Sequence, residues 1–136
     1  MVGISSQQES DTLIRTLLIV TALLEAATGF ALTASPSLLV SLLIGSPLDT
    51  RPGSVVGRLA GIARLTLGSV CWRARNDQQN GVSAGPIAAM LFYNVAVAIL
   101  LAYARLGLGL SGIGLWPTVA LHAVLAAWCI ACLLTR

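Results

Sequence analysis

The sequence predicts an all-α integral membrane protein: a four-helix transmembrane bundle with a short interfacial helix between the first two spanning helices. Only 10% of its 136 residues are charged and 57% are hydrophobic, whereas a soluble domain has about 25% charged residues. Four apolar segments are each long enough to cross a bilayer. Near its midpoint each segment carries one strongly polar side chain: Glu25, Arg64, Asn94 and His122. Because the spans use most of the chain, residues 1–136 are expected to form a single transmembrane domain.

The first predicted span covers residues 12–34 and follows a polar segment, residues 1–11, that we expect to be frayed. Ser35-Pro36 ends this helix, because proline fits the first turn of a new helix and serine is a good N-cap. Residues 36–44 are apolar but too short to cross a bilayer. They are therefore predicted to form an interfacial or re-entrant helix, closed by a Gly-Ser-Pro sequence.

The second span is predicted at residues 53–72 and is followed by the most polar stretch of the chain, residues 73–81, which ends in an Asn-Gly turn. The third span covers residues 84–105. A glycine-rich link, residues 106–112, is short enough to force the third and fourth helices to run antiparallel. The fourth span covers residues 113–134.

The basic residues are scattered arginines, and the net charge is +3. Without a basic run or patch, nucleic-acid binding is not expected. Arginines in short loops predict the orientation, because cytoplasmic loops are enriched in them. Four lie on the side of the termini and two on the other, which places both termini in the cytoplasm: Arg15, Arg73, Arg75 and Arg136 against Arg51 and Arg105.

The four central polar residues are predicted to meet inside the bundle. Each lies roughly nine to twelve residues into its helix, or about 13–18 Å, close to the middle of a ~30 Å hydrocarbon core. Glu25 and Arg64 are natural partners, because an unpaired charge in hydrocarbon is strongly disfavoured. Arg58, nearer the membrane boundary, could pair with Asp49 or a lipid phosphate, or could itself be the partner of Glu25.

Two interpretations of this polar centre stay open. Buried Glu–Arg, Asn and His contacts hold membrane helices together, at roughly 0.6–2 kcal/mol each. Alternatively, Glu25, Arg64, Asn94 and His122, with the neighbouring Tyr93 and Arg58, form a site that moves protons or binds the head group of a ligand.

Histidine and cysteine each allow one further hypothesis. The first is that His122 ligates a haem or chlorophyll-type macrocycle, although a lone histidine is more often a hydrogen-bonded packing residue. The chain has a single histidine, His122, so bis-His haem ligation within one subunit is excluded, and zinc or di-metal sites lack ligands. Cys129 and Cys132 form a CxxC near the predicted cytoplasmic end of the last helix, with Cys71 near the same side. This spacing supports thiol–disulfide exchange, although cysteine is also common as a small apolar residue in helices.

Several short motifs lie along the predicted helices: Ala34-Ser-Pro36 before a Leu-rich short helix, Arg58-Leu-Ala-Gly61 and Leu67-Gly68 in the second span, and Tyr93-Asn94 in the third. In these motifs the chain resembles bacterial four-helix membrane proteins of the DoxX-like type. This resemblance implies a bacterial inner membrane and a link with quinone- or thiol-coupled redox complexes, often as a small accessory subunit. It also implies a structured role for Arg58 at the membrane edge.

Three functions follow as hypotheses. The leading one is a non-catalytic accessory subunit of a larger membrane complex, because no strong catalytic motif is present and several helix faces carry small residues. The second is a homo-oligomeric transporter or ligand-binding protein that uses the polar centre. The third is a thiol- or quinone-linked oxidoreductase that uses Cys129 and Cys132. No cofactor is predicted, lipid and quinone remain open as ligands, and the expected partners are the bilayer, other membrane subunits or further copies of the chain.

Overall fold

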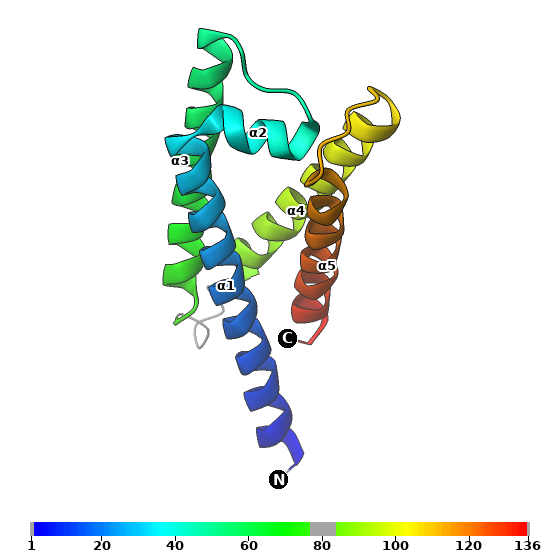
Figure 1. Ribbon diagram of the computed structural model, residues 1–136. Coiled ribbons are helices and arrows are strands. Elements are labelled where there is room, and N and C mark those ends of the chain that lie inside the picture. Colours follow the sequence, from blue (N-terminus) through cyan, green and yellow to red (C-terminus); the bar gives the residue numbers. More distant parts are fainter. Residues whose placement is uncertain (1, 77–83, 136) are drawn as a thin grey trace.

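The computed structural model describes residues 2–76 and 84–135, with side chains from residue 7 onward. Within these ranges the chain forms five helices and no strand, which confirms the predicted all-α fold (Figure 1). Four of the described helices are long and apolar enough to cross a membrane. The helices are α1 (Val2–Ala34), α2 (Pro36–Ile44), α3 (Arg51–Ala74), α4 (Ala84–Leu106) and α5 (Leu115–Leu134).

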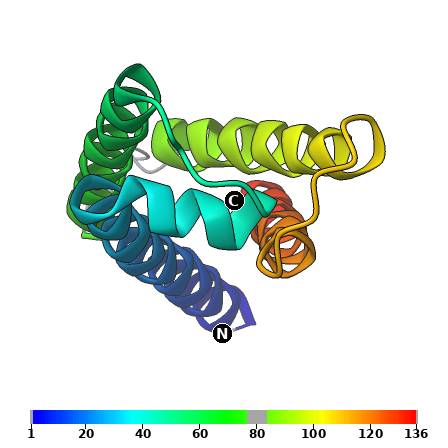
Figure 2. The ribbon, with the colours of Figure 1, turned by 45° about the horizontal axis from the view of Figure 1, so that its top comes forward.

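The four long helices run alternately up and down, and α2 lies across one end of the bundle (Figures 1 and 2). The beginning of α1 and the end of α5 both lie toward the opposite end. The short helix has the predicted bounds, with Pro36 in its first turn and Gly45 closing it in a left-handed conformation at φ 78°. Ser35 occupies the N-cap position, but its side chain makes no capping hydrogen bond.

The first helix is longer than predicted. It begins at Val2 and not near residue 12, so the expectation of a frayed N-terminal segment is wrong. A helix can continue beyond an apolar run where nothing breaks it, and this stretch contains no proline. The Thr12 hydroxyl also donates to the carbonyl of Gln8 at 2.9 Å, one turn earlier. The predicted Asn80-Gly81 turn and Arg136 lie outside the described residues.

The long helices form two pairs: α1 packs along α3, and α4 packs along α5, with less contact between the pairs. Glycine brings α1 and α3 into backbone contact. A Cβ atom on Gly61 would lie 2.7 Å from the carbonyl oxygen of Gly29 and 2.5 Å from the Thr33 hydroxyl, closer than real Cβ atoms approach. Gly57 and Gly68 are buried on the same face of α3. The small-residue pattern of α3 therefore serves packing within the chain.

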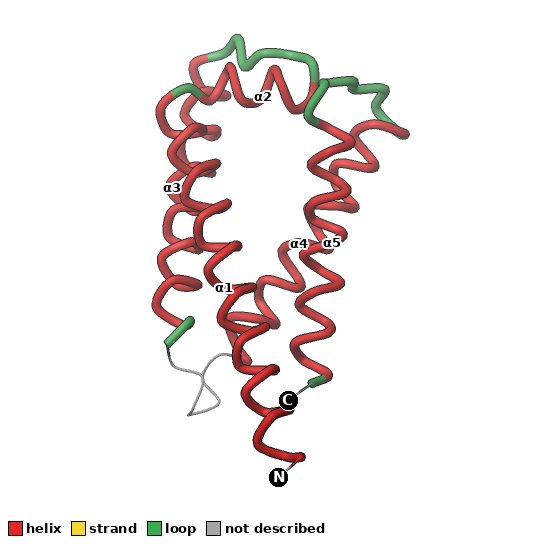
Figure 3. The backbone as a smooth tube through the Cα atoms, turned by 60° about the horizontal axis from the view of Figure 1, so that its bottom comes forward, coloured by secondary structure: helices red, strands yellow, loops and turns green. Residues whose placement is uncertain are grey.

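The two pairs share a compact core at the end of the bundle away from α2. Its buried apolar residues come from all four long helices and are Ile14, Leu17, Leu18, Ala22, Cys71, Ala74, Ile87, Met90, Leu125, Cys129 and Cys132. Beneath α2 the pairs stand further apart (Figure 3). The bundle thus has one end that is packed with these apolar side chains, the filled end, and one end that α2 covers.

The short helix α2 contacts both pairs. On one side Pro36 contacts Gly57 of α3, where a Cβ atom on the glycine would come within 2.7 Å of the proline ring. On the other side the Gly114 amide donates to the carbonyl of Leu42 at 2.9 Å. Gly112 lies so close to α2 that a Cβ atom there would overlap the backbone of Leu43. The glycine-rich link before α5 therefore lets the loop lie directly on α2.

Candidate functional site

Glu25 and Arg64 form an ion pair between the middle of α1 and the middle of α3. The Arg64 Nε atom lies 2.9 Å from Glu25 Oε2, and Nη2 donates to Oε1 at 3.3 Å. The guanidinium thus meets the carboxylate through one hydrogen bond, from Nη2, and one close charge contact, from Nε. The Glu25 side chain is only 2% exposed, whereas that of Arg64 is 22% exposed. Of the two candidate partners for Glu25, the structure therefore selects Arg64.

The glycine contact described above explains why this pair can form. Gly29 lies one turn after Glu25 on α1, and Gly61 lies one turn before Arg64 on α3. Because the two backbones touch at these glycines, the side chains next to them are held within hydrogen-bonding distance. Helices separated by larger residues would leave a buried carboxylate without its counter-charge, which is strongly destabilising.

Asn94 and His122 form the matching contact in the other pair. The two residues are 0% and 2% exposed, and His122 Nδ1 lies 2.7 Å from Asn94 Oδ1. The Asn94 amide group also donates to the carbonyl of Met90 at 2.8 Å. Both polar groups of the asparagine side chain are therefore used, which suits a residue buried in apolar surroundings.

Tyr93 lies between the two contacts. Its ring centroid is 5.7 Å from Arg64 Cζ, a cation–π distance, and 5.7 Å from the centroid of the His122 ring in an edge-on arrangement. The structure thus brings five of the six predicted site residues into one connected group, formed by Glu25, Arg64, Tyr93, Asn94 and His122.

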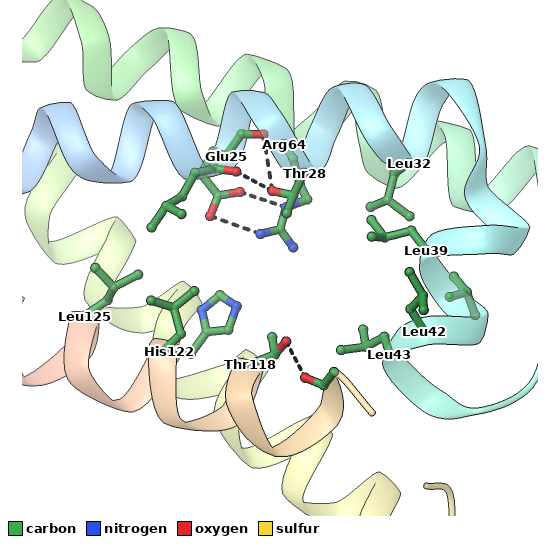
Figure 4. A pocket seen from close by; sticks show the side chains of 14 residues that line it. Glu25, Thr28, Leu32, Leu39, Leu42, Leu43, Arg64, Thr118, His122 and Leu125 are labelled. Atoms are coloured by element: carbon green, nitrogen blue, oxygen red, sulfur yellow. Dashed lines mark hydrogen bonds and ion pairs between the residues drawn. The ribbon is translucent and has the colours of Figure 1, made fainter. Parts of the chain in front are cut away.

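A cavity of about 180 Å³ opens beside this group, beneath α2. Glu25, Arg64 and His122 form part of its wall, and Figure 4 shows the His122 ring and the Arg64 guanidinium both turned toward it. Thr28 and Thr118 also face it, and their hydroxyls donate to the backbone carbonyls of Leu24 and Gly114, one turn earlier in the chain. The rest of the wall is apolar: Leu24, Leu32, Leu39, Val40, Leu42, Leu43, Gly114, Leu121 and Leu125.

Sequence reasoning missed this apolar part of the site. The sequence predicts an interfacial or re-entrant helix for the leucines of α2, and it does not indicate that they face Glu25 and Arg64. One signal was present, because Leu39, Leu42 and Leu43 are spaced three and four residues apart and so share a helix face.

The remaining predicted residues lie outside the polar group. Arg58 is exposed on α3, and it makes no ion pair with Asp49 or Glu25 in the described chain. Cys129 and Cys132 are buried in the filled end of the bundle, as is Cys71. Thiols in apolar surroundings are less reactive than exposed ones, because the thiolate is disfavoured there. Their use in redox chemistry stays a prediction.

Metal binding has no candidate site in the described part of the chain, where no three His, Cys, Asp or Glu side chains gather closely enough to hold an ion. The geometry of the polar group suits a different task. It offers hydrogen-bonding side chains at one wall of an otherwise apolar cavity, the usual composition of a small-molecule site.

Comparison with known proteins adds no assignment: no family model, no curated protein and no solved structure matches this chain.

Proposed function

We propose that this small membrane protein binds an amphipathic small molecule in the cavity beneath α2. The observation that carries the proposal is the wall of that cavity, in which Glu25, Arg64 and His122 stand beside an apolar lining of leucines. An amphipathic ligand would place its polar head at these three side chains and its apolar body against the leucines. Polar residues in transmembrane helices are costly and commonly mark functional sites.

The size of the cavity supports a compact ligand or the head of a longer one. Its volume is about 180 Å³, and an apolar cavity of roughly 150 Å³ accommodates benzene. A molecule with a single ring or a short chain therefore fits entirely. Lipid and quinone, the ligands left open by the sequence, would place only their head or a short part of their chain inside.

Native mass spectrometry of the protein from its own membranes, in mild detergent, tests this proposal. We expect a bound small molecule of constant mass. Thr118→Phe should fill the cavity and abolish that mass, because Thr118 is part of its wall. Ala120→Phe is the matched control, since Ala120 is exposed on the same helix. Preparations that carry no small molecule, or that retain it in Thr118→Phe, would contradict ligand binding in this cavity. If the protein also transports its ligand, Thr118→Phe should lower the flux as well.

A second function is favoured by one observation on α5. Ala123, Ala127 and Ala131 are exposed at four-residue spacing, a small-xxx-small pattern that allows another helix to approach closely. We propose this face as the contact for a further membrane subunit, which would make the chain an accessory subunit. In native mass spectra, polypeptides of other sequence at fixed stoichiometry would support this role. Ala127→Trp should release them, and a chain that always occurs alone would contradict it.

Kinship with DoxX-like proteins remains a proposal and gives the accessory role a context. It would place the chain in a bacterial inner membrane and near a quinone- or thiol-coupled redox complex. Identification of the copurifying polypeptides tests it, since redox proteins among them are expected and their absence would remove the connection.

The orientation with both termini in the cytoplasm is also a proposal, supported by the arginine distribution. In this orientation α2 and the cavity lie near the outer side of the membrane, because α2 crosses the end of the bundle away from the termini. A reporter that is active only outside the cytoplasm, fused to the C-terminus, should be inactive. Activity of that fusion would reverse the orientation.

A further inference from the structure

The hydrogen bonds around His122 determine which of its ring nitrogens carries the proton. The Asn94 amide group donates to the carbonyl of Met90, so the Asn94 atom that faces His122 is the oxygen Oδ1, an acceptor. His122 Nδ1 must therefore be the donor in the 2.7 Å contact. A protonated His122 would lack a counter-charge, because the Glu25 carboxylate already pairs with Arg64, so the buried imidazole is neutral. In a neutral imidazole the other nitrogen, Nε2, is then an acceptor without a proton.

This acceptor has no partner among the described residues, although His122 is only 2% exposed. The His122 ring forms part of the cavity wall and is turned toward the cavity in Figure 4. An acceptor that faces an apolar cavity and has no partner there is costly. A ligand that donates a hydrogen bond to Nε2 would remove that cost.

Arg64 supplies the opposite kind of group. Its Nε and Nη2 atoms contact the Glu25 carboxylate, which leaves Nη1 as a donor without a protein partner in the described chain. Figure 4 shows this third nitrogen on the side of the guanidinium that faces the cavity. The cavity therefore presents one donor, from α3, and one acceptor, from α5.

The charge at this wall is already balanced. The guanidinium of Arg64 compensates the carboxylate of Glu25, and His122 in the assigned form is neutral. An anionic head group would lie beside the carboxylate and would face an acceptor nitrogen, whereas a cationic head group would lie beside the guanidinium. Burial of a charged head group in such an apolar site is costly unless a free counter-charge is present.

We infer that the head group bound in this cavity is an uncharged hydroxyl, as in a phenol or an alcohol. A hydroxyl can donate to His122 Nε2 and accept from Arg64 Nη1, whereas an ether or a ketone can only accept. This inference rests on the proposed function and narrows it to one class of ligand. It concerns only groups that the ion pair and the Asn94 contact leave free.

Two isomeric probes test the inference in the purified full-length protein in mild detergent. Para-propylphenol and para-ethylanisole have the same molecular formula, but only the phenol has a hydroxyl group. Isothermal titration calorimetry should show that the phenol binds about 10-fold more tightly or better, as expected when an acceptor in the wall of an apolar cavity gains or lacks its donor. The unaltered protein suffices for this comparison, so it does not depend on any variant being folded.

Variants locate the effect at one atom. His122→Phe removes the acceptor and should reduce the preference for the phenol to about twofold or less, while binding of the ether persists. His122→Gln keeps a side-chain acceptor and should restore part of the preference. Thr118→Phe should abolish binding of both isomers, because it fills the cavity.

The outcomes separate the inference from the proposed function. Equal binding of the two isomers, or a preference that survives in His122→Phe, would overturn the hydroxyl assignment and leave ligand binding intact. Tighter binding of para-propylbenzoate, a carboxylate of similar size, would overturn the uncharged head group. If none of the three probes binds, the proposed binding function itself fails.

Discussion

The two helix pairs bury polar side chains in different ways. In the pair formed by α1 and α3, glycine brings the backbones into contact, and a charged pair forms beside that contact. In the pair formed by α4 and α5, larger side chains fill the interface, and the polar contact is the neutral hydrogen bond between Asn94 and His122. Charges need a short and fixed separation in apolar surroundings, whereas a neutral hydrogen bond costs less to bury.

The cavity lies between these two helix pairs. One wall supplies the ion pair and the other supplies the imidazole. A wall with only charged groups would favour ionic ligands, and a wall with only neutral groups would provide no strong donor. Together the two walls give a site that offers hydrogen-bonding groups and has a net charge close to zero.

The largest expected effect comes from breaking the charged contact. Arg64→Met leaves the buried Glu25 carboxylate without its partner, and should lower the free energy of unfolding by about 3–5 kcal/mol. Unfolding in mixed micelles with increasing denaturing detergent measures this change. The loss should be smaller at acid pH, because a protonated carboxyl group carries no charge.

A double variant provides the control. Glu25→Leu combined with Arg64→Met removes both charges and should recover most of the stability, because an apolar pair can replace a buried ion pair. A double variant as unstable as Arg64→Met alone would mean that packing by the two side chains matters, and not their charges.

The next largest effect tests the backbone contact. Gly61→Ala places a Cβ atom 2.5 Å from the Thr33 hydroxyl and 2.7 Å from the carbonyl of Gly29. Overpacking of this kind should cost about 1–3 kcal/mol, measured by the same unfolding experiment. Gly85→Ala is the matched control in α4, where nothing lies within 4 Å of the added atom. Equal stability of the two variants would show that α1 and α3 do not need their close contact.

Much of the fold could be predicted from sequence, because an apolar run of about 20 residues has few alternatives to a spanning helix. The bounds of α2 followed from Pro36 and Gly45, whose backbone preferences are strong. The start of α1 could not be predicted in this way, because hydropathy marks where a helix enters lipid and not where it begins. The division of the four long helices into two pairs could not be predicted either. Faces of small residues indicate that helices pack closely, but they do not indicate which helices pack against each other.

The candidate site could be predicted only in its polar half. Polar side chains are rare in apolar helices and therefore stand out, and five of the six named residues do form one group. The choice between Arg58 and Arg64 needed the structure, because both lie on α3 within two turns of each other. The leucines of the cavity could not be recognised, because lipid tails are as apolar as leucine and give no pattern that separates the two environments.

A smaller effect is expected in the neutral pair. Asn94→Leu removes the hydrogen bond to His122 and should cost about 0.6–2 kcal/mol, the range for such contacts between membrane helices. The loss should not depend on charge, so it should change less with pH than the loss in Arg64→Met. A cost as large as that of Arg64→Met would contradict the distinction between the two pairs.

The smallest effect is expected at Arg58. This residue shares α3 with Arg64, but it is exposed and makes no ion pair with any described residue. Arg58→Met should therefore change the free energy of unfolding by no more than about 0.5 kcal/mol, as substitutions outside packed and paired positions usually do. Measured beside Arg64→Met, it compares the same chemical change at two positions of one helix. A large loss at Arg58 and a small one at Arg64 would reverse the assignment of the partner of Glu25, and with it the reason why α1 and α3 need their glycine contact.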